Sequence, residues 1–176
     1  KEIAKSNKAF IIYKSDKGFD LYTDFSKKII LTNSNIKNFI NKATKFKLKK
    51  KETDIFIGFF GYEILNNLIG IKLKKQKGLK FPKGIFYKPE TKVKLQNKLD
   101  YKNLKLTKSN KYFKININKF SYKVIFDKFK KKIKSGETYQ IKICTKYNNS
   151  TQIDALDFFC RLVKMNMAPE AFMIKD

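Results

Sequence analysis

The chain has 176 residues, enough for one domain with a hydrophobic core, and 42% hydrophobic with 15% aromatic residues excludes a disordered protein. Its net charge of +26 would suit a protein that binds nucleic acid. Arg161 is the only arginine, however, and proteins that read nucleic acid depend on arginine for bidentate contacts. An AT-rich coding sequence explains the many lysines, asparagines and isoleucines better. We therefore expect no specific nucleic acid partner. A basic nucleic-acid-binding domain without enzyme activity is the alternative from a different class.

Several kinds of site are excluded by composition. The chain contains no histidine, so Ser-His and Cys-His catalytic pairs cannot form, and we expect neither a catalytic residue nor a metal site here. Cys144 and Cys160 lack metal-ligand spacing and make no disulfide framework, which is typical of thiols in a reducing compartment. There is no signal peptide and no apolar run of membrane-spanning length, so we expect no membrane partner and a cytoplasmic protein.

Short strands dominate the N-terminal third. Residues 9–13 and 19–22 are apolar strands around a turn at 14–18, and residues 28–31 form a third strand. Asn33 or Ser34 caps a helix whose apolar face carries Ile36, Phe39, Ile40 and Ala43. A lysine-rich loop follows at residues 47–51.

The middle of the chain continues this mixture. Residues 55–60 read as a central buried strand containing Gly58, and residues 62–68 as a short helix. After a surface excursion at 72–80, residues 81–87 and 93–95 form a hairpin that turns at 88–91. Residues 97–110 are a polar linker, and residues 112–117 a further strand.

The most informative block spans residues 122–147. Apolar residues recur at helical spacing, which predicts a helix with one buried face, formed by Tyr122, Ile125, Phe126, Phe129 and Ile133. Gly136 ends this helix, and residues 139–147 alternate as a half-buried strand. Tyr139 and Gln140 could reach a ligand, but a buried tyrosine beside a hydrogen-bonded glutamine is the commoner arrangement.

A last helix begins near residue 156. Asp154 and Asp157 lie one turn apart at its start, where they favour the helix dipole and cap the chain. An apolar strand follows at residues 171–174. Strands with interleaved helices and frequent hairpins predict an α+β fold with a mostly antiparallel β-sheet and helices packed on it.

Three collinear segments resemble one enzyme family. Gly58-x-x-Gly61-Tyr62-Glu63 is similar to a strand–helix turn, and Gly136-Glu137 with Tyr139-Gln140-Ile141 to a helix–strand signature. Residues 156–172 resemble the helix and the Asn-x-x-Pro turn that follow, with Asn166 and Pro169. This pattern resembles the chorismate-utilising synthases, component I of aminodeoxychorismate (para-aminobenzoate) synthase and of anthranilate synthase. The resemblance implies a partial anthranilate-synthase-component-I-like fold.

The same resemblance implies a function. The full enzyme would be a transferase that aminates chorismate to 4-amino-4-deoxychorismate in folate biosynthesis. The alternative is anthranilate synthase, a lyase of tryptophan biosynthesis. A glutamine amidotransferase subunit or fused domain would supply ammonia, and Mg²⁺ would bind the catalytic C-terminal half. We expect this chain to be an N-terminal fragment without that half. Residues 1–110 would form its N-terminal region, and residues 111–176 would begin the chorismate-binding region.

The family also binds tryptophan between an N-terminal strand–turn and the Asn-x-x-Pro turn. Here the resemblance places that pocket between residues 11–15 and 166–172, with Ser15, Pro169, Glu170, Ala171 and Phe172 as its residues. Ser15 lies one place from the family's serine, and Glu170 replaces its usual aromatic residue. Because an acid repels a ligand carboxylate, the sequence predicts a degenerate tryptophan site.

Overall fold

The computed structural model describes residues 8–44, 51–62, 64, 69–70, 81–95, 112–150 and 154–176. These residues divide into two compact units, Lys1–Tyr101 with Phe159–Asp176, and Lys102–Phe158. The expected loop at 47–51 lies mostly outside the described residues. So do most of the helix at 62–68, the excursion at 72–80 and the linker at 97–110. Within the described part, no helix has the length and apolar character needed to cross a membrane.

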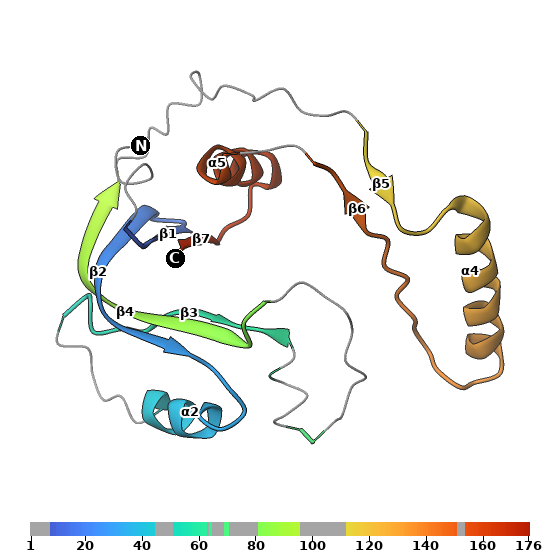
Figure 1. The fold of residues 1–176 in the computed structure, drawn as a ribbon, viewed down its shortest axis with the longest axis horizontal. Helices are drawn as coiled ribbons and strands as arrows, with labels where there is room; N and C mark the ends of the chain where they lie inside the picture. The colour runs from blue at the N-terminus through green and yellow to red at the C-terminus, as the bar shows by residue number, and fades with distance from the viewer. Residues whose placement is uncertain are drawn as a thin grey trace. The chain divides into compact units, whose positions relative to one another are not determined.

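The first unit contains a five-stranded sheet in the order β3-β4-β2-β1-β7 (Figure 1). All four neighbouring pairs are antiparallel. The strands are β1 (Phe10–Ser15), β2 (Gly18–Ile30), β3 (Ile57–Phe60), β4 (Gly84–Leu95) and β7 (Ala171–Lys175). The α+β class and the mostly antiparallel sheet are therefore as expected.

Two of the strands are longer than the sequence predicts. The expected strands at 19–22 and 28–31 are parts of the single 13-residue strand β2. The polar residues between them suggest a break in the strand, but Thr23 pairs with Thr91 and Phe25 with Pro89. The register shifts between Phe25 and Lys27, so β2 has one residue more than β4 at this point. The polarity of this segment therefore reflects partial exposure of a strand rather than its end.

The hairpin expected at residues 81–95 is also wrong, because β4 runs straight through Pro89. Pro89 faces Phe25 at the irregularity in β2. A proline lacks the N–H that continues a ladder, so a bulge is where a strand tolerates one. The Pro89 side chain is fully buried, which shows that packing holds it inside the sheet.

The predicted central strand at 55–60 is instead the edge strand β3, and residues 57–59 are only partly buried. Phe60 of β3 and Phe56, just before the strand, contribute to an aromatic group with Phe39 and Phe86. Helix α2 (Ile36–Thr44) supplies Phe39 to that group. A helix that covers an edge strand produces the same apolar sequence as a central position, which explains the wrong prediction.

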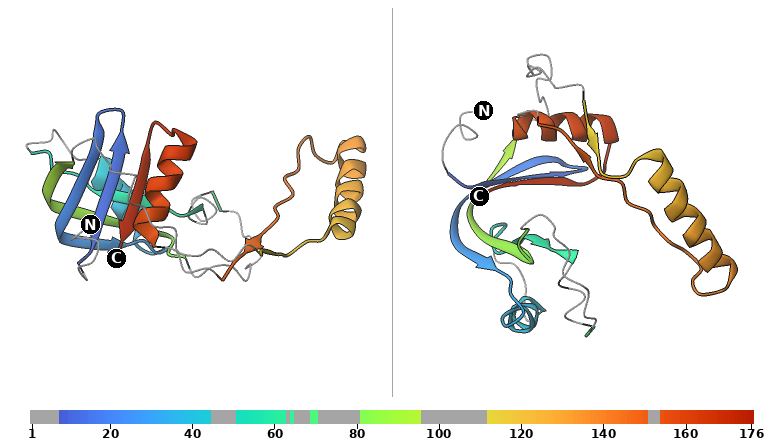
Figure 2. Two further views of the ribbon diagram at one scale, coloured as in Figure 1. Left: turned by 90° about the horizontal axis from the view of Figure 1, so that it is seen from above. Right: turned by 45° about the vertical axis from the view of Figure 1, so that its right-hand side comes forward.

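Two helices lie against different parts of this sheet (Figures 1 and 2). Helix α2 begins at Ile36, one to two residues later than the expected caps require, and joins a cluster with Leu31, Ile64 and Phe86. Helix α5 (Ala155–Asn166) lies beside β1 and β7 and buries Phe159, Cys160 and Val163. Its start is capped as predicted, since the Asp157 amide donates to Asp154 Oδ1 at 2.8 Å.

A second cluster occupies the opposite face of β1 from Phe10 and Ile12. It contains the buried residues Ile11, Tyr22 and Tyr87. Partly buried neighbours surround them, namely Tyr13, Phe25, Ile55, Ile57, Ile85 and Ile174. Because successive side chains of a strand point to opposite faces, β1 contributes apolar residues to both sides of the sheet.

The second unit is built on helix α4 (Lys119–Lys134) and the two-residue strands β5 (Lys114–Ile115) and β6 (Tyr147–Asn148). Asn118 caps α4, accepting a 2.8 Å hydrogen bond from the Ser121 amide. The prediction of a long strand at 139–147 is wrong, because β6 contains only the last of these residues. The prediction that one face of the helix is buried is also wrong: α4 has no buried residue, and Phe126 and Ile133 are 46% and 42% exposed.

Candidate functional site

The antiparallel pairing of β1 with β7 brings together the two segments expected to form a pocket. Tyr13 pairs with Phe172, and Lys14 pairs with Ala171. Residues 10–14 therefore lie directly beside residues 171–175, although more than 150 positions separate them in sequence.

Lys14 holds the turn between α5 and β7 in place. Its Nζ donates to the Ala168 carbonyl at 2.7 Å and to the Pro169 carbonyl at 3.2 Å. Met167, at the start of this turn, has a φ of 47°, a left-handed conformation that is uncommon outside glycine. The Lys14 ammonium offsets the two carbonyl dipoles, so it fixes a turn that the backbone alone does not favour.

Tyr13 and Glu170 are coupled at this edge. Partial burial raises the pKa of the Tyr13 hydroxyl, and a hydrogen bond to the Glu170 carboxylate raises it further. The carboxylate stabilises the protonated phenol and disfavours the phenolate. Glu170 itself is exposed at the edge of the sheet. Its charge therefore lies where a ligand approaching β7 would meet it.

The other predicted pocket residues lie along this edge and differ in their exposure and contacts. Ser15 Oγ accepts a 3.2 Å hydrogen bond from the Lys17 amide, so its hydroxyl is engaged in the β1–β2 turn. Ala171 is half-buried, whereas Pro169 is exposed and Phe172 is 49% exposed. The arrangement offers an exposed aromatic ring, an acid and a lysine. A small zwitterion would therefore meet both signs of charge.

The first family segment lies at the β3–β4 edge. A Cβ added to Gly58 would lie 1.9 Å from the Ile85 carbonyl oxygen, so only glycine fits between the strands. The Gly61 amide donates to the Lys83 carbonyl at 2.7 Å, and Tyr62 is 74% exposed. Glu63 lies outside the described residues. These glycines let two backbones approach closely, which is a role in packing.

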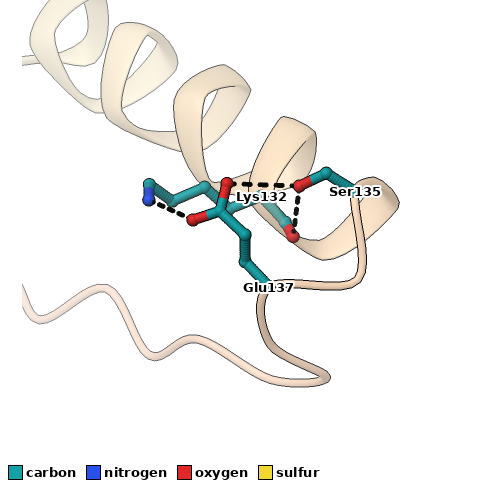
Figure 3. A network of polar contacts seen from close by, with 3 residues as sticks. All are labelled: Lys132, Ser135 and Glu137. Atoms are coloured by element: carbon teal, nitrogen blue, oxygen red, sulfur yellow. Dashed lines mark hydrogen bonds and ion pairs between the residues drawn. The ribbon is translucent and has the colours of Figure 1, made fainter.

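The second family segment, Gly136-Glu137, ends helix α4 (Figure 3). Gly136 has a φ of 76°, and the Glu137 amide donates to the Lys132 carbonyl at 3.0 Å. The Glu137 carboxylate accepts from Lys132 Nζ at 2.5 Å and from Ser135 Oγ at 3.3 Å. The Lys132 ammonium lowers the pKa of this carboxyl group. The glutamate of this segment therefore serves to fix the end of the helix.

Tyr139 and Gln140 are both exposed, Tyr139 to 93%. The expectation of a buried tyrosine in a sheet is therefore wrong, because residues 139–146 have no strand partner among the described residues. The sequence does not predict that Lys14 binds the carbonyls of the turn before β7, because nothing in the local sequence around Lys14 signals it. It also does not predict the hydrogen bond from Ser135 to Glu137, for which the only signal is the spacing Lys132-x-x-Ser135-x-Glu137.

No group of three or more His, Cys, Asp or Glu side chains forms a metal site within the described ranges. Cys144 is exposed and Cys160 is buried, each as a thiol.

Residues 3–176 match the family model for chorismate binding enzymes. Because the match covers nearly the whole chain, the chain belongs to the chorismate-binding enzyme family, whose members act on chorismate. Among curated proteins, none matches it.

Proposed function

We propose that the chain is the N-terminal portion of component I of aminodeoxychorismate synthase. The full enzyme would aminate chorismate to 4-amino-4-deoxychorismate on the route to folate. Ammonia would come from a glutamine amidotransferase subunit or a fused domain. The family match over residues 3–176 carries this proposal. The order of the segments at Gly58, Gly136 and Pro169 supports it.

The proposal assigns catalysis to a C-terminal half that is not part of this sequence. The sequence has no histidine, and the described residues offer no three-ligand cation site. We therefore propose that the acid–base groups and the Mg²⁺ ligands reside in that half. This chain would contribute the scaffold, with the β1–β7 edge on one unit and the α4 turn on the other. The division between residues 1–110 and 111–176 is part of the same proposal.

Anthranilate synthase component I is the second candidate. Asp176 and Asn166 fit both enzymes. Phe19-Asp20 and Thr138-Tyr139-Gln140 look nearer to the aminodeoxychorismate branch. The two enzymes use the same substrate and ammonia, so they are separated by their products. Aminodeoxychorismate retains the enolpyruvyl group that anthranilate synthase eliminates.

The test combines the purified chain with chorismate, Mg²⁺ and an ammonium salt, followed by chromatography of the products. We expect no product from the chain alone. The same assay on this chain joined to its own C-terminal half, which the proposal places after Asp176, should yield aminodeoxychorismate. Formation of anthranilate by that longer protein would favour the second candidate. Product from the chain alone would contradict the proposed division of labour, and a longer protein that yields neither product would contradict the proposed function.

A further inference from the structure

The turn between α5 and β7 presents two carbonyl oxygens to one ammonium group. The successive carbonyls of Ala168 and Pro169 both accept hydrogen bonds from Lys14 Nζ, at 2.7 Å and 3.2 Å. The turn follows directly after Asn166, the last residue of α5, where the helix dipole places negative partial charge. Carbonyl oxygens only accept hydrogen bonds, so this pair is suited to a cation that carries several N–H donors.

The backbone of this turn is strained without such a cation. Met167 is its first residue and has a φ of 47°, which brings a Cβ close to the following carbonyl oxygen. The Met167 amide donates to the Val163 carbonyl at 3.2 Å, which ends the helix but leaves the next two carbonyls to be satisfied by other groups. A strained backbone persists only where its surroundings hold it, and here the surroundings include the ammonium group of Lys14.

Strand β1 supplies two successive residues that hold this turn. Lys14 pairs with Ala171 in the β1–β7 register and is half-buried. Tyr13 points to the opposite face of the sheet, and its hydroxyl bonds to the Glu170 carboxylate. One residue of the strand therefore binds backbone carbonyls of the turn, and the residue before it binds the acid at the end of the turn.

We propose that Lys14 is a built-in occupant of an ammonium subsite formed by the Ala168 and Pro169 carbonyls. Its ammonium group lies where the amino group of a free amino acid or amine would otherwise bind. The pocket that the family resemblance places between residues 11–15 and 166–172 is then filled from within the chain at one polar position. The turn keeps its conformation without an effector, so this edge is not regulated by an amino acid. The inference rests on the family and on this geometry, and it does not depend on the product of the proposed enzyme.

This role of Lys14 is separate from the effect of Glu170. The Glu170 carboxylate repels the carboxylate of a ligand, whereas Lys14 competes with its amino group for the same two carbonyls and repels it by like charge. Tryptamine has the indole ring and the ammonium group of tryptophan but no carboxylate, so Glu170 does not repel it. Binding of tryptamine therefore reports on the ammonium subsite alone.

The first experiment removes the Lys14 ammonium group in two ways. Lys14→Ala also removes the stem and leaves room for a small ion, whereas Lys14→Met keeps most of the stem. Both should lower the midpoint of thermal unfolding by about 3 °C or more, and Lys17→Ala should not, because Lys17 is an exposed lysine of the same hairpin. Ethylammonium chloride should raise the midpoint of Lys14→Ala, because it binds the vacated carbonyls. Tetramethylammonium chloride at the same ionic strength has no N–H donor and should not, and Lys14→Met should respond to neither salt.

The second experiment measures tryptamine binding by calorimetry, with this chain and then with the chain joined to its own C-terminal half. Lys14→Ala should bind tryptamine at least about tenfold more tightly than the unchanged chain, since it frees two acceptors for charge-assisted hydrogen bonds. Lys17→Ala removes the same charge elsewhere and should bind like the unchanged chain. Calorimetry does not depend on turnover, so the outcome here and the outcome of the product assay are independent.

Several results would overturn the proposal. An unchanged unfolding midpoint in Lys14→Ala would show that Lys14 does not hold the turn. A loss that ethylammonium fails to restore, or that both salts restore equally, would identify a structural contact without an ammonium subsite. Equal tryptamine affinity of Lys14→Ala and the unchanged chain would show that Lys14 does not exclude a ligand. A further measurement needs no substitution: in NMR of the unchanged chain, the ammonium protons of Lys14 should exchange with water more slowly than those of Lys17, and equally fast exchange would contradict the two hydrogen bonds.

Discussion

Tyr87 is buried on β4 with its hydroxyl away from solvent, at 2% exposure. Among the described residues this hydroxyl makes no hydrogen bond. Burial raises its pKa, and the nearby Asp176 carboxylate adds to the effect. A buried hydroxyl without a partner has lost its bonds to water without replacement, which is unfavourable. The aromatic ring, by contrast, packs 4.8 Å from the Phe25 ring between their centroids.

Tyr87→Phe should therefore change the free energy of unfolding by less than about 1 kcal/mol, or stabilise the protein. Tyr87→Ala removes the ring and should cost about 3–5 kcal/mol. Urea unfolding of both variants measures the difference. A loss of more than about 2 kcal/mol in Tyr87→Phe would show that the hydroxyl has a stabilising partner.

We expect Glu170 to prevent free tryptophan from binding at the β1–β7 edge. Its carboxylate would repel the ligand carboxylate, and it already bonds to Tyr13. We expect tryptophan to bind more weakly than millimolar, which corresponds to a binding free energy smaller than about 4 kcal/mol. Glu170→Tyr should strengthen binding, and Glu170→Gln separates the effect of charge from that of the ring. Calorimetry that shows micromolar binding to the unchanged chain would contradict a degenerate site and favour anthranilate synthase.

Among the elements, the β3–β4 pair depends most directly on one residue. A side chain at Gly58 would collide with the Ile85 backbone, which cannot move without breaking the ladder. Gly58→Ala should cost about 3 kcal/mol. Gly136→Ala is a useful comparison, because its Cβ would meet nothing within 4 Å and only its φ of 76° is unfavourable. That substitution should cost about 1 kcal/mol. Equal costs in thermal or urea unfolding would show that β3 can shift away from β4.

The elements also show what the sequence could predict. Helices α4 and α5 and strand β7 follow from periodicity, caps and the glycine at 136. The continuity of β2 and β4 does not, because it depends on Phe25 meeting Pro89 across the sheet. The edge position of β3 depends on cover from α2. The segment at 139–146 has the alternation of a strand but no partner within the described residues, and a pattern of side chains cannot supply one.

For the whole molecule, three short segments of the sequence were enough to predict the family, but they predicted the site only in part. The sequence resemblance placed residues 11–15 and 166–172 together, and within these ranges the β1–β7 register pairs Tyr13 with Phe172 and Lys14 with Ala171. The bonds from Lys14 to the Ala168 and Pro169 carbonyls had no local signature, since they connect positions separated by most of the chain.

The stability of the first unit should fall in alkaline solution because of its tyrosines. Tyr13, Tyr22 and Tyr87 all have raised pKa values, each mainly because burial disfavours the phenolate. Above the ordinary tyrosine pKa of about 10, the unfolded chain loses these protons while the folded chain keeps them. Their contribution is therefore complete below about pH 10 and is lost as the pH rises through the raised pKa values. One fully shifted tyrosine accounts for at most about 1.4 kcal/mol per pH unit.

Urea unfolding at several pH values between 9 and 11 measures this slope. Lysine deprotonation also relieves charge repulsion in the same range, so the informative quantity is a difference between variants that share every lysine. Tyr87→Phe should show a shallower fall of stability with pH than the unchanged chain, because one buried titrating group is gone. Tyr139→Phe removes an exposed tyrosine and should leave the slope unchanged. If the two variants have the same pH dependence, burial of Tyr87 does not govern alkaline unfolding. The loss of stability would then belong to Tyr13, Tyr22 or Lys92, whose folded-state pKa values are also raised.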